Sequence, residues 1–191
     1  MKHIATLALM LTLGAASVYA QQHPVNMRFS GSGGPSPIDL KQPNTVNFEE
    51  HVAGNGSLGP FTYRDLRAAS IPPQSIGACP GPFLPAAFGG GIFRFEDGSL
   101  LTFSIKPKEG GDCIDMVQKV ARCTLTLEIT GGTGRFQNAS GVLTYTETAA
   151  LLAVADFSTV PPTVFMTTET GEITGAISVP AGQEGLPGAA R

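Results

Sequence analysis

The sequence contains no tryptophan, few charged residues and no cluster of lysine and arginine. Only 14% of its 191 residues are charged, and 12 basic residues stand against 15 acidic ones. Nucleic acids and anionic membrane surfaces are bound through basic patches, so we expect neither as a partner. Without tryptophan, the chain also lacks the Trp packed on a Cys pair that marks immunoglobulin domains.

The motifs of common hydrolytic, phosphate-binding and metal sites are also missing. There is no G-x-S-x-G elbow for a nucleophilic serine, and there is no C-x-x-C pair. No Lys-Ser/Thr pair follows Gly134, so the glycine-rich stretch around it does not read as a phosphate loop. A lone His51 beside Asn47 and Glu49 is more typical of a surface than of a catalytic base. We therefore expect no hydrolase activity, no metal and no cofactor.

The longest hydrophobic run stands at the N-terminus and is typical of a secretory signal. A short basic start precedes the apolar Ile4–Ala16, and the small residues around Ala20 suit a signal peptidase. We expect cleavage before Gln21, so that residues 1–20 are removed and the protein is secreted or periplasmic. The run is shorter than the roughly 20 apolar residues that span a bilayer, so no membrane insertion is expected after cleavage.

Glycine, proline and threonine are plentiful, which favours β-strands and turns over helices. Eight runs with strand character follow one another in four pairs, and most of them alternate apolar and polar residues. This order predicts an all-β fold, an eight-stranded antiparallel up-and-down barrel over residues 45–178, with a β-sandwich as the alternative. Residues 21–44 are expected to form a flexible N-terminal arm and residues 179–191 a flexible tail. The runs are Thr45–Val52, Pro60–Ala69, Gly89–Phe95, Ser99–Ile105, Cys123–Thr130, Gly141–Thr148, Thr163–Glu169 and Glu172–Ser178.

Turn residues between these runs predict the connections. Asp97-Gly98 is a strong hairpin cue, because both residues tolerate positive φ. The last two runs are expected to form a hairpin around Thr170-Gly171. The segment Asp115–Ala121 is either one helical turn or another extended piece.

The most informative stretch is Ile129–Gly141, which connects two of the predicted strands. Its glycines Gly132, Gly134 and Gly141 let the backbone take φ > 0 without steric cost. Phe136 is the only large apolar side chain between the two runs and is expected to plug one end of a core. Arg135 beside it is interpreted as a solvent-facing turn residue.

The pattern G-T-G-R-F-x-x-A-x-G at residues 132–141 resembles the corresponding segment of dirigent proteins. It is also similar to the G-x-G-x-F segment of allene oxide cyclases, and bacterial secreted proteins with an allene-oxide-cyclase-like barrel resemble it more closely. The match covers about ten residues, and the rest of the chain agrees in strand layout. The resemblance implies an eight-stranded antiparallel barrel around an apolar cavity, and it does not imply a particular reaction.

Three cysteines, Cys79, Cys113 and Cys123, follow the expected cleavage site. An odd number in an exported chain suggests one disulfide and one remaining thiol. The short separation of Cys113 and Cys123 favours that pair. Cys79, in a loop rich in proline and glycine, is an alternative partner for either, and three unpaired thiols are the remaining alternative.

Polar side chains within the predicted strands are the candidates for chemistry. Tyr145 and Glu147 share a strand face with Leu143, whereas Glu128 shares its face with three threonines. One face of a barrel strand lines the lumen and the other faces outward, and parity alone leaves the choice open. Glu128 and Glu147 are then either solvated or subunit-interface charges, or a carboxylate lies with Tyr145 in an apolar cavity. There a glutamate is more easily kept protonated and is able to act as an acid.

The phenylalanines at alternating strand positions are the candidate ligand-lining residues. A barrel of eight strands is either filled by its own side chains or holds one small ligand. We expect a small hydrophobic molecule as the partner. The sequence does not decide whether the protein forms a homo-oligomer. Three classes of function remain: a ligand-holding barrel, a dirigent-like or cyclase-like protein that orients a reactive intermediate, and an exported structural or adhesion module with a filled core. The candidate lining residues are Phe93, Phe95, Phe103 and Phe165.

Overall fold

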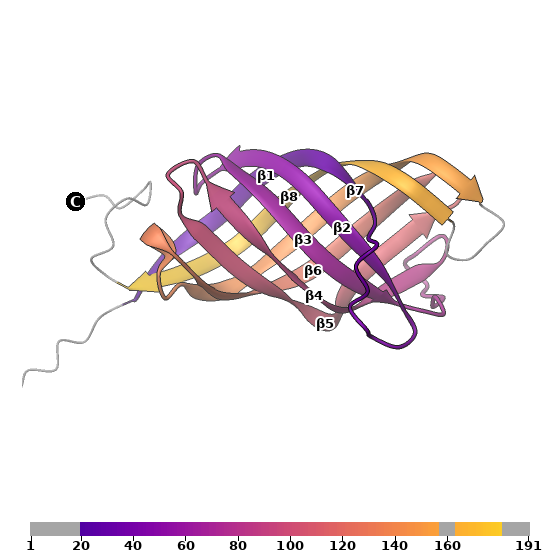
Figure 1. Cartoon of the computed structure of the whole chain (residues 1–191), viewed down its shortest axis with the longest axis horizontal. Coiled ribbons are helices and arrows are strands. Elements are labelled where there is room, and N and C mark those ends of the chain that lie inside the picture. Colours follow the sequence, from indigo (N-terminus) through magenta and orange to yellow (C-terminus); the bar gives the residue numbers. More distant parts are fainter. Residues whose placement is uncertain (1–19, 157–162, 181–191) are drawn as a thin grey trace, which may run out of the picture.

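The protein folds into a closed, eight-stranded antiparallel β-barrel in which each strand pairs with the next and the last pairs with the first (Figure 1). The computed structural model describes residues 20–156 and 163–180, without the side chains of residues 153–165. The barrel predicted from the sequence is therefore confirmed over the described residues, and the sandwich alternative is wrong. The strands are β1 (Ala20–Pro35), β2 (Thr45–Gly56), β3 (Phe61–Ser70), β4 (Phe83–Phe95), β5 (Leu100–Asp115), β6 (Val120–Gly132), β7 (Ser140–Asp156) and β8 (Thr163–Pro180).

The first strand, β1, replaces most of the flexible arm predicted for residues 21–44. It pairs with β2 on one side and with β8 on the other. Its alternate residues Val25, Met27 and Phe29 are buried, while the residues between them are exposed. The alternation was present in the sequence, but the glycines, serines and prolines around it suggested a loop. Residues 36–44 do form a connection between β1 and β2.

The last strand, β8, is continuous where the sequence predicted a hairpin around Thr170-Gly171. It pairs with β7 and β1 along its length. Gly171 makes room for a neighbouring ring, because a Cβ built there would lie 2.4 Å from Cζ of Phe29. The predicted number of strands is thus correct, although one strand is gained at the N-terminal side and two predicted strands merge into one.

One end of the barrel, here called the closed end, carries the short connections 57–60, 96–99 and 133–139. The Asp97-Gly98 hairpin is confirmed, with Gly98 at φ +80°. Phe136, in the 3-10 helix η1 (Gly134–Phe136), is fully buried and its ring centroid lies 4.7 Å from that of Phe95. The expected plug is confirmed.

Arg135 is a component of this plug, and its predicted solvent-facing position is wrong. Its guanidinium lies over the rings of Phe95 and Phe136, 4.9 and 4.8 Å from their centroids. Its Nη2 donates a hydrogen bond to the Leu58 carbonyl oxygen at 2.6 Å. The glycines of the motif permit this close packing, since a Cβ at Gly134 would meet Ser99 Oγ at 2.4 Å.

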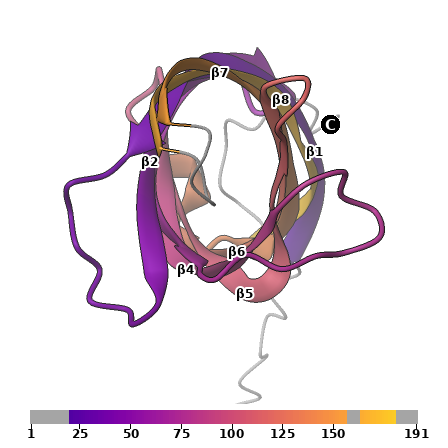
Figure 2. The same cartoon turned by 90° about the vertical axis from the view of Figure 1, so that its right-hand side faces the viewer.

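The opposite end, here called the open end, carries the longer connections 36–44 and 71–82 and the turn at 116–119. The segment Asp115–Ala121 is therefore a strand end, a turn and the next strand, and not a helical turn. Viewed into this end, the two longer connections extend to either side of the mouth (Figure 2). No helix in the described part of the chain is long and apolar enough to span a membrane.

The disulfide joins Cys79 to Cys113, with Cα atoms 5.6 Å apart, and Cys123 is a buried free thiol. The predicted Cys113–Cys123 pair is therefore wrong. Although the two residues lie on adjacent strands, Cys123 pairs directly with Asp112 and not with Cys113. Successive side chains of a strand point to opposite faces, so Cys113 and Cys123 face away from each other. Cys113 instead meets the connection 71–82 on the outside of the barrel.

Candidate functional site

The lumen has three layers, which follow from the alternation of inward-pointing residues along each strand. At the open end the inward residues are mainly apolar, one step deeper they are charged, and deeper still they are aromatic. On β2, for example, Phe48 lies at the mouth, Glu50 below it and Val52 in the core. On β5 and β7 the corresponding charged residues are Asp112 and Glu147.

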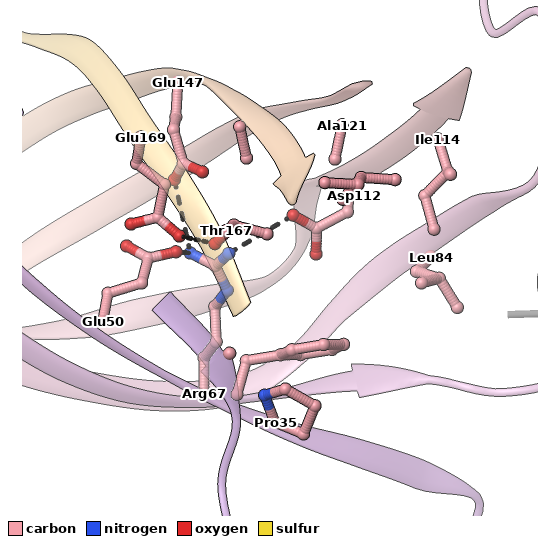
Figure 3. A pocket seen from close by; sticks show the side chains of 14 residues that line it. Pro35, Glu50, Arg67, Leu84, Asp112, Ile114, Ala121, Glu147, Thr167 and Glu169 are labelled. Atoms are coloured by element: carbon pink, nitrogen blue, oxygen red, sulfur yellow. Dashed lines mark hydrogen bonds and ion pairs between the residues drawn. The ribbon is translucent and has the colours of Figure 1, made fainter. Parts of the chain in front are cut away.

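A pocket opens into the first two layers (Figure 3). The centre of a water molecule can move through about 60 Å³ of it. One buried water needs roughly 10–15 Å³ of such volume, so the pocket has room for several waters or for one end of a small molecule. Its apolar wall, called here the apolar collar, consists of Phe48, Leu84, Ile114, Ala121, Ala149 and Leu151.

The charged layer consists of five carboxyl groups around one guanidinium and is called here the carboxyl cluster. Its basic member, Arg67, is the only lysine or arginine among the buried residues of the described chain. Its members come from five strands, β2, β3, β5, β7 and β8, because each of these strands points a side chain into the lumen at about the same depth. The acidic members are Glu50, Asp65, Asp112, Glu147 and Glu169.

Arg67 is at the centre of the cluster. Its Nη1 forms an ion pair with Glu50 Oε1 and lies 4.0 Å from Glu147 Oε2. Its Nη2 lies 3.4 Å from Asp112 Oδ1. Burial by itself disfavours the charged guanidinium, but the carboxylates of Glu50 and Asp112 outweigh it and raise the pKa of Arg67. Arg67 therefore carries the positive charge that permits carboxylates to be buried here.

Tyr145 connects two of the glutamates from the aromatic layer below. Its hydroxyl oxygen lies 2.7 Å from Glu50 Oε2 and 2.5 Å from Glu147 Oε2. A phenol carries one proton, so two such hydrogen bonds require a second proton from a carboxyl group. Burial, followed by the charge of Glu50, raises the pKa of Glu147 well above its usual range. The second proton therefore belongs to Glu147, which donates to Tyr145 while Tyr145 donates to Glu50.

Asp65 is held in a similar way by Tyr63, whose hydroxyl donates to Asp65 Oδ2 at 2.8 Å. Burial is the main cause that raises the pKa of Asp65, and the Glu50 carboxylate adds to it. The Tyr63 and Tyr145 rings stack with centroids 5.7 Å apart. The two phenols thus form the boundary between the charged layer and the packed core.

Glu169 borders the pocket, and only one of its two carboxyl oxygens has a hydrogen-bond partner. Its Oε1 lies 2.5 Å from Thr167 Oγ1, which is also 3.1 Å from the Gly33 carbonyl oxygen. Its Oε2 is buried and has no hydrogen-bond partner. Burial, followed by the charge of Glu50, raises the pKa of Glu169 to about 7. Near neutral pH this group is therefore able both to donate and to accept a proton.

Three carboxyl groups converge closely enough to share one cation. Glu50, Glu147 and Glu169 each offer one oxygen, and these oxygens lie within 4.8 Å of one another. In the described part of the chain this is the one group of acidic, histidine or cysteine side chains with a spacing that suits a metal ion. Arg67 already pairs with Glu50, however, and its positive charge repels a divalent ion at this place more strongly than a singly charged one.

The structure separates the candidate residues that the sequence put forward. Tyr145 and Glu147 both lie in the lumen and belong to the site, whereas Glu128 is exposed on the outer face. Phe93, Phe95 and Phe103 are buried, but they pack in the closed half and do not line the pocket. The Phe165 side chain lies outside the described part of the chain.

Sequence reasoning missed most of the cluster. Glu50, Asp112, Glu169 and Arg67 were not singled out. A signal was present in β3, where Phe61, Tyr63, Asp65 and Arg67 occupy alternate positions, so that two charges follow two aromatic residues on one face.

No protein-family model and no curated protein sequence matches this chain.

Proposed function

We propose that the protein is an exported barrel that binds a small, mainly apolar molecule at its open end. The polar end of the molecule is held by the carboxyl cluster, and its apolar part lies against the apolar collar. The observation that carries this proposal is the pocket itself, in which apolar side chains such as Leu84 and Ile114 stand above buried charges. Ligand sites commonly combine an apolar wall with a few polar groups that fix orientation.

The size of the pocket limits the ligand. Pockets for drug-sized molecules measure roughly 300–1,000 Å³, well above the space available here. Only the polar end and a few further atoms of a ligand fit inside, and the rest must lie along the mouth. A short-chain amphipathic molecule suits this shape better than a large polycyclic one.

Export is supported by two independent features. The N-terminal segment is typical of a secretory signal. The Cys79–Cys113 disulfide suits an oxidising compartment, since disulfides persist mainly outside the cytosol.

Two matched Ala→Leu variants test the binding proposal. Ala149→Leu fills the pocket, and Ala176→Leu places the same side chain on the outer half-exposed face. Titration with Nile red, with 1-hexanol as competitor, should show saturable binding to the natural protein and to Ala176→Leu. We expect Ala149→Leu to weaken binding roughly tenfold, the loss of about 1.4 kcal/mol of contact. Equal binding by both variants would contradict the proposed location.

A second candidate is catalysis of the dirigent or cyclase type, because the motif at residues 132–141 resembles segments of dirigent proteins and allene oxide cyclases. It is favoured by the pKa of Glu169, about 7, at the edge of a partly apolar pocket. A carboxyl group with such a pKa is suited to general acid catalysis, and orientation of a bound intermediate needs few reactive groups. A coupling or cyclisation reaction that is racemic in free solution should then give one enantiomer in excess with the protein. Loss of this excess in Glu169→Gln supports catalysis, whereas racemic product with saturable binding leaves the binding function alone.

A further inference from the structure

We propose that the pocket selects a cation, and that its ligand is a small apolar primary amine bound as the ammonium ion. This inference rests on the proposed binding function and specifies the chemistry of the ligand's polar end. Three observations carry it: the charge balance of the cluster, a buried oxygen without a partner, and the spacing of the converging carboxyl groups.

The charge balance favours a cation. Five buried carboxyl groups surround the single guanidinium of Arg67. Two of them, Glu147 and Asp65, share hydrogen bonds with tyrosines, and burial raises the pKa of both carboxyl groups well above the usual range. An added positive charge favours the ionised forms of these carboxyl groups. An added negative charge would instead compete with the carboxyl groups of Glu50, Asp65, Asp112 and Glu147, which already form ion pairs with Arg67.

Glu169 provides the unoccupied position. Its side chain is buried, 4% exposed overall, and yet its Oε2 accepts no hydrogen bond from any described residue. A buried carboxylate oxygen without a partner costs free energy, and a donor from a ligand would remove that cost. Glu169 and Glu50 lie side by side next to the pocket (Figure 3).

The spacing of the oxygens suits an ammonium group. A primary ammonium donates three hydrogen bonds of about 2.8 Å in tetrahedral directions, which places its acceptors about 4.6 Å apart. The oxygens of Glu50, Glu147 and Glu169 lie within 4.8 Å of one another. A bare metal ion would use the same oxygens but would leave the apolar collar without a role. The collar gives the hydrocarbon part of an amine its contact.

Binding of an ammonium ion should be coupled to proton release. Glu169 is about half protonated near pH 7, and the bound cation favours its ionised form, as it does that of Glu147. Affinity should therefore rise as the pH increases through neutrality. The groups that face Glu169 are Gly33 on β1, Glu50 on β2, Arg67 on β3, Asp112 on β5 and Glu147 on β7, with Thr167 beside it on β8.

Three probes with the same hydrocarbon chain test the proposal: n-hexylammonium, 1-hexanol and hexanoate. Isothermal titration calorimetry on the natural protein at about pH 8 should show that hexylammonium binds roughly tenfold more tightly than 1-hexanol. This is the difference expected when the ammonium group forms one charge-assisted hydrogen bond more than the hydroxyl group does. The difference should narrow at about pH 6, where Glu169 is mostly protonated. Equal affinity for the amine and the alcohol overturns the cation inference and leaves the binding function intact.

Other outcomes are equally informative. Tighter binding of hexanoate would assign the polar end to Arg67 and overturn the inference. Calcium that displaces hexylammonium at comparable concentrations would identify a metal site in its place. Absence of binding by all three probes would contradict the proposed function itself.

Two Glu→Gln variants locate the selectivity. Glu169→Gln should reduce the preference for hexylammonium over 1-hexanol roughly tenfold. Glu128→Gln, on the outer face, removes a carboxylate far from the pocket and should leave both the preference and the affinity for 1-hexanol unchanged. A loss of preference that is equal in both variants would mean that only net charge matters. The comparison of probes on the natural protein does not depend on either variant.

Discussion

At the scale of the residue, the central finding is that Arg67 holds a group of buried acids together. Its guanidinium pairs with Glu50 and lies within 4.0 Å of an oxygen of Asp65, Asp112 and Glu147. A buried ion pair adds little net stability, but removal of one partner leaves a charge without compensation. The single sequence indicates Tyr145 and Glu147 by their shared face with Leu143. For Arg67 it indicates at most the strand face, through the alternation on β3, because the contacts that surround this arginine come from strands far apart in the chain.

Replacement of Arg67 should therefore be strongly destabilising. We expect Arg67→Met to lower the free energy of unfolding by about 3–5 kcal/mol near neutral pH, as for other broken buried pairs. Urea denaturation monitored by circular dichroism provides the measurement. The neighbouring Arg64 points outward on the same strand, and Arg64→Met is the matched control, with no measurable change expected. Equal stability of the two variants would contradict the role of Arg67.

The pH dependence of stability should be opposite to that of most proteins. The pKa of Glu169 is raised from 4.5 to about 7 on folding, so between these values the folded state binds more protons than the unfolded state. Stability from this group is complete below about pH 4.5 and is lost as the pH rises through about 7. Asp65 and Glu147, whose pKa values are also raised, act in the same direction.

Urea midpoints measured from about pH 5 to about pH 8 should accordingly fall with rising pH. Glu169→Gln, which cannot titrate, should make the dependence shallower. Midpoints that rise over this range in the natural protein would show that these carboxyl groups are ionised at little cost.

At the scale of the element, the sequence predicts strands well where alternation is clear and the turn is tight. The hairpin at Asp97-Gly98 is the best example. The prediction of strands from the sequence fails where a glycine permits close packing and does not form a turn, because the position of a glycine in the sequence does not distinguish these two uses. Gly171 was interpreted as a hairpin turn, yet it lies within the continuous β8 opposite the ring of Phe29. The glycines at positions 31, 33 and 34 likewise suggested a flexible arm, although they lie within β1.

Alanine substitution distinguishes the two uses of glycine. A Cβ at position 171 would meet the Thr146 carbonyl oxygen at 2.2 Å and the Phe29 ring at 2.4 Å. We expect Gly171→Ala to destabilise the barrel by about 1–3 kcal/mol, as other overpacking substitutions do. Gly77→Ala is the control, since nothing lies within 4 Å of its Cβ position. Thermal unfolding that is unchanged in Gly171→Ala would contradict the continuous strand.

At the scale of the whole molecule, the two ends of the barrel differ in construction. The closed end has short turns and a plug that consists of the Phe95 and Phe136 rings with the Arg135 guanidinium over them. The open end has the longer connections, the pocket and the disulfide. The sequence indicates the plug through the motif at residues 132–141. It does not indicate the pocket, because pocket position depends on how eight strands close around one axis.

The disulfide should contribute to the stability of the whole barrel. It closes a loop across 34 residues of sequence separation, and the chain-entropy model assigns about 3–4 kcal/mol to such a loop. We expect Cys113→Ser to lower the unfolding free energy by an amount of this order. Cys123→Ser is the control, because it also replaces one cysteine but leaves the disulfide intact, and it should not remove the stabilisation that the disulfide provides. Peptide mapping without reduction should recover Cys79 linked to Cys113, and a linkage to Cys123 would contradict the structure.

The most direct test of the proposed binding site is to locate a bound probe within the barrel. Methyl NMR spectra should be recorded while n-hexylammonium or 1-hexanol is added to the protein. We expect saturable shifts at the open end, in the methyl groups of Leu84, Ile114 and Leu151, and none at Leu58 in the closed end. Shifts confined to the closed end or to the outer face, or no saturable shift with either probe, would contradict the proposed site.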